Sequence, residues 1–143
     1  KEKVLLCENR GDILDRIGKW SEALKEYERS LEFCDDGYVK AEIYRKIGDI
    51  HHMSMSDVIA AAVYYQLGLR ELPEDDESVQ KVRLIHSILH TFNFIHNSEE
   101  RDNAIKQATE IAERMGYMQE LAVIYAAFGK NAKIGNRIKN RYE

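Results

Sequence analysis

The chain has 143 residues, enough for one ordinary domain or a short array of repeats. Hydrophobic residues make up 44% of it, which excludes intrinsic disorder as the general state of the chain. The net charge of −4 combines a basic tail over 130–143 with an acidic remainder. This distribution argues against general nucleic-acid binding, which needs a basic face on the fold itself. No apolar run approaches the ~20 residues of a membrane-spanning helix, so a membrane role is not expected.

The first predicted element is a helical hairpin over residues 4–37. Gly11 lies on its first helix, and Ala23 and Tyr27 lie on its second. The small residues would let two antiparallel helices approach closely, and the tyrosine would fill the space beside them. We expect a short break near 18–20, with Ser21 as the cap of the second helix. The Asp36-Gly37 pair is interpreted as the exit of that helix.

A second hairpin over 41–74 repeats this pattern 37 residues later. Gly48 takes the place of the first glycine, and we align Ala60 and Tyr64 with the alanine and tyrosine of the first hairpin. The break between the two helices falls near 54–57, where Asp57 is the predicted cap.

A third hairpin over 78–116 follows the pattern less closely. Asp75 or Asp76 is predicted to cap its first helix, and Gly116 to end its second.

A last helix begins near 118, and no complete returning helix follows before residue 143. We therefore expect Tyr125, Phe128 and Ile134 to leave an apolar edge. Terminal repeats normally need a polar outer face to stay soluble, so this C-terminal helix is a candidate surface for self-association.

Every apolar periodicity in the chain is near 3.6 residues, which predicts an all-α fold of about seven helices without a sheet. The stretches 4–36 and 41–74 resemble tetratricopeptide repeats (TPR), in a variant longer than the usual 34 residues. The resemblance is carried by Gly11, Leu14, Ala23, Tyr27, Tyr44, Gly48, Ala60 and Tyr64, with Pro73 one residue beyond its usual place. It implies a right-handed α-solenoid of antiparallel helix hairpins. The repeats at 4–37, 41–74, 78–116 and, in part, 118–143 would form one array over 1–143, interpreted as a fragment of a longer protein.

Arrays of this family are similar in holding a peptide or helix of a partner in a concave groove lined by the first helix of each hairpin. The resemblance places the following residues in that groove: Leu5, Glu8, Asp12, Asp15, Arg45, Asp49, His52, His86 and Asn93. The N-terminal part of the groove would be acidic and would suit a basic or amphipathic segment. An ordinary solvated face is an equal alternative for these carboxylates.

No catalytic pattern is present: the sequence has no Gly-rich phosphate loop, nucleophile elbow or Cys-x-x-Cys pair. We therefore expect neither an enzyme nor a cofactor. His86 and His90 have the spacing that lets two imidazoles share a metal, but no further ligand motif accompanies them, so no metal site is predicted. A pH-sensitive groove is the other interpretation of the histidines.

Cys7 and Cys34 are too few for a disulfide framework, which favours a reducing compartment and a cytoplasmic location. Two buried free thiols are expected, although hairpin geometry would place both near the same end and leaves a bridge open. The sequence as a whole predicts a protein–protein interaction module, a scaffold or adaptor. The alternatives are a ligand-sensing array of a regulator whose effector domain lies outside this chain, and a self-association module.

Overall fold

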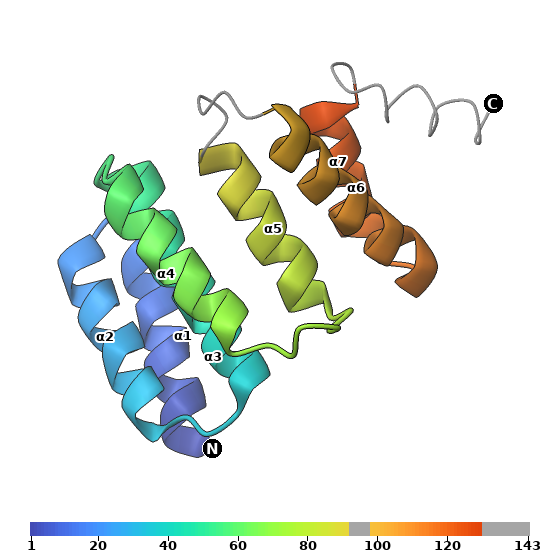
Figure 1. Ribbon diagram of the computed structural model, residues 1–143. Coiled ribbons are helices and arrows are strands. Elements are labelled where there is room, and N and C mark those ends of the chain that lie inside the picture. Colours follow the sequence, from blue (N-terminus) through green and yellow to red (C-terminus); the bar gives the residue numbers. More distant parts are fainter. Residues whose placement is uncertain (92–97, 130–143) are drawn as a thin grey trace. The chain divides into compact units, whose positions relative to one another are not determined.

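The computed structural model describes residues 1–91 and 98–129, and within these ranges the chain is all-helical (Figure 1). The described residues form seven α-helices, one π-helical turn and no β-strand, as the sequence predicted. The helices are α1 (Glu2–Arg16), α2 (Trp20–Phe33), α3 (Gly37–Asp49), α4 (Val58–Arg70), α5 (Val79–Thr91), α6 (Ser98–Met115) and α7 (Met118–Phe128). The π-helical turn η1 (Ile50–Ser54) continues directly from α3. Among the described helices, none combines the length and apolar character needed to cross a bilayer.

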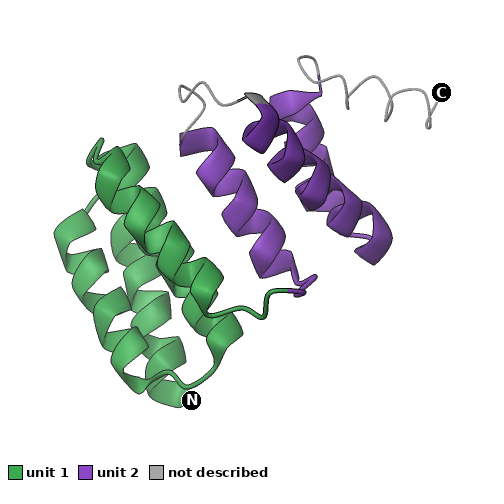
Figure 2. Cartoon of the chain, in the orientation of Figure 1, with its two compact units in different colours: residues 1–74 green, residues 75–143 purple. Residues whose placement is uncertain are grey.

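The chain divides into two compact units, which we call unit 1 (residues 1–74) and unit 2 (residues 75–143) (Figure 2). Unit 1 consists of two helical hairpins, α1 with α2 and α3 with α4, and α2 also contacts α3. In unit 2, α6 packs against both α5 and α7.

Each hairpin of unit 1 is closed by a contact between a glycine and a tyrosine. A Cβ atom at Gly11 would lie only 2.6 Å from Cε1 of Tyr27, and a Cβ atom at Gly48 would meet the ring of Tyr65 at least as closely. Both tyrosines are almost fully buried, so their rings have little room to move. Glycine is therefore required at both positions to let the helices approach.

The predicted register of the second hairpin was wrong by one residue. Ala61 and Tyr65 are fully buried and take the places assigned to Ala60 and Tyr64. The additional residue is accommodated in the stretch that contains η1, where the amide of Met55 donates to the carbonyl of residue 50, five positions earlier. A π-helical turn holds one more residue than an α-helical turn, and it shifts all that follows by one position.

Two predicted helix ends are confirmed. The carboxylate of Asp57 accepts a hydrogen bond from the amide of Ala60 (3.0 Å) and caps α4. Gly116 has a φ of +75° directly after α6, which is the left-handed conformation that glycine adopts most readily. Asp76 supports the start of α5 by accepting from the amide of Ser78 (2.9 Å), and the Ser78 hydroxyl accepts in turn from the amide of residue 81.

Two other predicted ends are corrected. Ser21 lies inside the first turn of α2, whose N-cap is Lys19 without a side-chain hydrogen bond. Asp36 does not end a helix; its carboxylate accepts from the amides of Tyr38 (2.9 Å) and Val39 (3.3 Å) and so caps α3. An aspartate before a glycine can either end a helix or cap the next one. Here three non-helical residues, 34–36, separate α2 from α3, so Asp36 lies at the start of α3.

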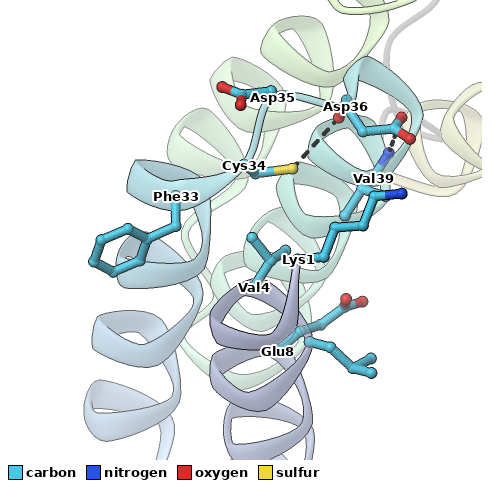
Figure 3. A pocket seen from close by; sticks show the side chains of 9 residues that line it. Lys1, Val4, Glu8, Phe33, Cys34, Asp35, Asp36 and Val39 are labelled. Carbon is cyan, nitrogen blue, oxygen red and sulfur yellow. Dashed lines mark hydrogen bonds between the residues drawn. The ribbon is translucent and has the colours of Figure 1, made fainter.

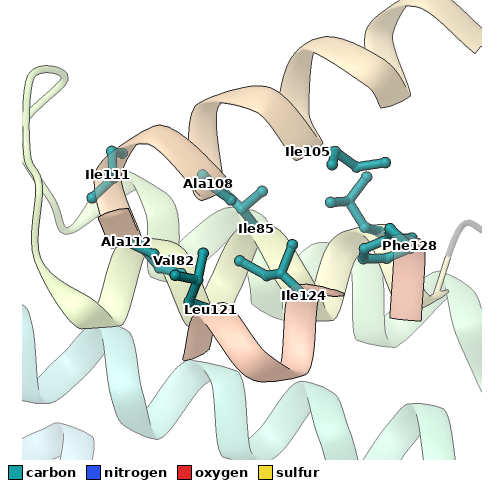
Figure 4. Close-up of a cluster of buried hydrophobic side chains, with 10 residues drawn as sticks. Val82, Ile85, Ile105, Ala108, Ile111, Ala112, Leu121, Ile124 and Phe128 are labelled. Atoms are coloured by element: carbon teal, nitrogen blue, oxygen red, sulfur yellow. The ribbon is translucent and has the colours of Figure 1, made fainter. Parts of the chain in front are cut away.

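The core of unit 2 is built from all three of its helices (Figure 4). Its buried side chains are Val82, Ile85 and Leu89 from α5, Ile105, Ala108, Ile111 and Ala112 from α6, and Leu121, Ile124 and Phe128 from α7. The burial of Phe128 corrects the expected apolar edge. Tyr125 is half-buried and donates to Oε1 of Glu113 (3.0 Å), while Ile134 lies outside the described residues.

Candidate functional site

Charged side chains from α1 and α3 meet on one face of unit 1. Glu8, Asp12 and Asp15 recur at intervals of four and three residues, which places them along one side of α1. The facing groups of α3 are Glu42, Arg45, Lys46 and Asp49. We call these seven residues the acidic face. It contains five of the nine residues predicted to line a groove.

Lys46 joins the two helices across this face. Its Nζ lies 2.7 Å from Oε1 of Glu8 and 2.9 and 3.0 Å from the two carboxylate oxygens of Asp12. Burial alone would lower the pKa of Lys46, but the hydrogen bonds to Glu8 and Asp12 outweigh burial and raise it. Lys46 was missed in the sequence, because spacing along α3 does not show which side chain reaches across to α1.

Arg45 holds the other two carboxylates of α3. Its guanidinium bonds Glu42, one turn earlier, and lies 2.8 Å from Oδ2 of Asp49, one turn later. These pairs have the i,i+3 and i,i+4 spacings at which side chains of one helix meet.

A tyrosine hydroxyl fixes the aspartate that follows each closely packed glycine. Tyr27 donates to Oδ1 of Asp12 and Tyr65 donates to Oδ1 of Asp49, both over 2.6 Å. Burial, together with the hydrogen bond to the carboxylate, raises the pKa of Tyr27, so this phenol stays a donor. The packing of each hairpin therefore also positions one carboxylate of the acidic face.

Asp15 differs from the other carboxylates of the face. Among the described residues, its side chain takes part in no hydrogen bond or ion pair. Burial raises the pKa of Asp15, and the negative charges of Asp12 and Asp49 raise it further. Five carboxylates thus share two cations, Arg45 and Lys46, and Asp15 is the one that neither cation pairs with.

The remaining predicted groove residues lie elsewhere. His52 is half-buried in η1, next to His51, whose ring stacks on Tyr64 with centroids 5.2 Å apart. His86 belongs to unit 2, where its ring lies 6.0 Å from that of Phe128 and 6.2 Å from that of His90. Asn93 lies outside the described residues. Over residues 1–91 and 98–129, no group of three or more His, Cys, Asp or Glu side chains is arranged to hold a metal ion.

Comparison of the chain with protein-family models, with curated proteins and with solved structures gave no match.

Proposed function

We propose that unit 1 is a protein-interaction module that holds a basic or amphipathic segment of a partner protein on its acidic face. The observation that carries the proposal is the unpaired carboxylate of Asp15, which lies beside Asp12 and Asp49 on a face with three more negative than positive charges. A lysine or arginine placed there would relieve like-charge repulsion as it binds, which gives a cation an advantage over water.

Two carboxylates of the acidic face are each held by a tyrosine and a cation. Asp12 is held by Tyr27 and Lys46, and Asp49 by Tyr65 and Arg45. Side chains that are already fixed lose little conformational entropy when a ligand arrives. This order favours a binding face over the alternative of unstructured surface carboxylates.

We infer further that the two hairpins of unit 1 are tetratricopeptide-like repeats of an α-solenoid that binds and does not catalyse. The support is the repeated contact of Gly11 with Tyr27 and of Gly48 with Tyr65. Cys7 and Cys34 are both free and buried, which fits the reducing environment of the cytoplasm.

The structure also shows which carboxylate to change in a test. Reversing the charge of Asp12 or Asp49 would break the hydrogen bond from a buried tyrosine, so a loss of binding would be mixed with a loss of stability. Asp15 has no such bond. Asp15→Asn therefore removes the charge with little change in shape.

The test uses a fluorescein-labelled Gly/Ser peptide with lysines at alternate positions, and a second peptide with glutamates in their place. By anisotropy, we expect the lysine peptide to bind the full chain with a Kd of about 1 μM at low salt and more weakly as salt rises. Asp15→Asn should weaken binding about threefold to tenfold. Glu28→Gln, an equal change of charge at an exposed position of α2, should not. Equal affinity for both peptides, or no effect of Asp15→Asn, would contradict the proposal.

A further inference from the structure

A pocket of about 400 Å³ lies where the start of α1, the end of α2 and the start of α3 meet (Figure 3). Its apolar wall is formed by Val4, Leu5, Phe33, Cys34 and Val39. Val4 and Cys34 belong to the buried core, whereas Leu5 and Phe33 are 59% and 45% exposed. The pocket is therefore open to solvent at its mouth and closed by the core at its base. Its volume is within the range of roughly 300–1,000 Å³ that is common for ligand sites.

The polar residues around this pocket are mostly acidic. Glu8, Asp35 and Asp36 contribute carboxylates and Lys1 contributes one cation. The carboxylate of Asp36 is engaged at the N-terminus of α3, and the thiol of Cys34 donates to the carbonyl of residue 36 (3.5 Å). An apolar cavity with such a rim favours an apolar group that is carried on a positively charged chain.

Glu8 connects the pocket with the acidic face. It lines the pocket and also holds Nζ of Lys46, which in turn bonds Asp12. The two features are therefore neighbouring parts of one surface of unit 1, and a single ligand can contact both.

We propose that the pocket receives a large apolar side chain of the same partner segment whose lysine or arginine side chains lie on the acidic face. This rests on the proposed function and makes it more specific: the segment is extended, and one aromatic or long aliphatic anchor precedes or follows its basic residues at a fixed distance. Buried anchors of this kind carry much of the affinity of protein interfaces, while exposed charges contribute mainly rate and specificity.

The helix geometry sets the distance between anchor and charge. Val4 and Asp12 are eight residues apart on α1, which corresponds to a rise of about 12 Å. An extended chain covers this length with about four residues, at roughly 3.3 Å each. Side chains two and four residues apart lie on the same side of an extended chain, so an anchor and a lysine four positions away would both face unit 1.

The experiment compares two labelled Gly/Ser peptides that carry lysines about four and six residues to either side of a central residue, which is tryptophan in one and alanine in the other. Titrations on the full chain should give an affinity at least about tenfold higher for the tryptophan peptide. Alkylation of Cys34, followed by peptide mass spectrometry, reports where the peptide binds. The tryptophan peptide should slow alkylation at Cys34 more than the alanine peptide does, with Cys7 as the internal reference because it does not line the pocket.

A matched pair of variants locates the anchor without disturbing the core. Leu5→Lys places a cation at the mouth of the pocket. The tryptophan and alanine peptides should then bind this variant with about equal affinity. Leu6→Lys makes the same change at the next residue, which is equally exposed but does not line the pocket, and should keep the preference. Asp15→Asn should lower the affinity for both peptides by the same factor.

The outcomes separate the two proposals. If both peptides bind equally and both respond to salt and to Asp15→Asn, the anchor is wrong and the proposed function stands. If the tryptophan preference persists in Leu5→Lys, the apolar contact lies elsewhere and the pocket is not its site. If neither peptide binds, the proposed function fails and the anchor with it.

Discussion

Helix α1 and the stretch formed by α3 and η1 share two apolar positions, which are exposed in the first and buried in the second. The offset of 37 residues that relates Gly11 to Gly48 also relates Leu6 to Ile43. Leu6 is 58% exposed and Ile43 is fully buried. At the next corresponding pair, Ile13 is 58% exposed and Ile50 only 2% exposed.

The exposure of these positions differs because a neighbouring helix covers one of the two faces. Ile43 and Ile47 of α3 and Ile50 of η1 belong to a core that α2 also forms. Tyr27 of α2 lies in this core, and the partly buried Leu24 and Leu31 pack against it. No described helix of unit 1 lies on the corresponding face of α1. A helical period therefore tells which side of a helix is apolar, and the arrangement of the other helices decides whether that side is buried.

The largest expected effect tests this difference directly. Ile43→Ala removes buried atoms from a packed core and should lower the free energy of unfolding by about 2–5 kcal/mol. Leu6→Ala, at the corresponding position of α1, should change it by less than about 0.5 kcal/mol. Urea unfolding monitored by circular dichroism measures both. Similar losses in the two variants would mean that the face of α1 is also covered, and the comparison would fail.

The second prediction tests what the two hairpins share. Gly11→Ala and Gly48→Ala should each destabilise the chain by about 1–3 kcal/mol, because the new methyl group meets a buried tyrosine ring. An uncrowded helical glycine would show the opposite sign, since alanine is favoured over glycine in helices by about 1 kcal/mol.

The control for this prediction is the ring itself. By itself, Tyr27→Leu should lower stability. Gly11→Ala should then destabilise a chain that carries Tyr27→Leu much less than it destabilises the natural chain. Thermal melts of the two single variants and the double variant give this coupling. Stabilisation by Gly11→Ala or by Gly48→Ala would show that the hairpin register is wrong.

The sequence predicted the components of these hairpins better than their connections. Gly11 and Gly48 could be recognised because close helix packing permits few other residues. The sequence could not show that Tyr65, and not Tyr64, packs against Gly48, because a π-helical turn has no residue signature comparable to a glycine or proline. Periodicity fixes positions on one helix, and a single extra residue between helices changes which side chains meet.

The same limit applies to the candidate site. The carboxylates of α1 were found from their spacing, since i,i+4 neighbours share a face. Their pairing with Lys46 depends on how far α3 lies from α1, and the pocket beside Glu8 depends on where three helix ends meet. Both are consequences of packing between elements, which local sequence does not encode. The charge of the face was predictable, whereas the single unpaired carboxylate was not.

The smallest expected effect concerns Asp15, and its sign is the informative part. Burial and the charges of Asp12 and Asp49 raise the pKa of Asp15 in the folded chain above its usual 3.8. The folded state then holds this proton more tightly than the unfolded state, so Asp15 lowers stability progressively as pH rises through that window. Asp15→Asn should therefore increase stability at pH 7, by less than about 1 kcal/mol for a group that is only partly buried.

That gain should shrink as pH falls towards 4, because the natural side chain becomes neutral as well. Thermal melts between pH 7 and pH 4 follow this gain, with Glu28→Gln, at an exposed position of α2, as the control. The same Asp15→Asn variant is expected to bind the lysine peptide more weakly. A carboxylate that costs stability and supports binding is one retained for its ligand, whereas a loss of both in Asp15→Asn would assign Asp15 to the fold.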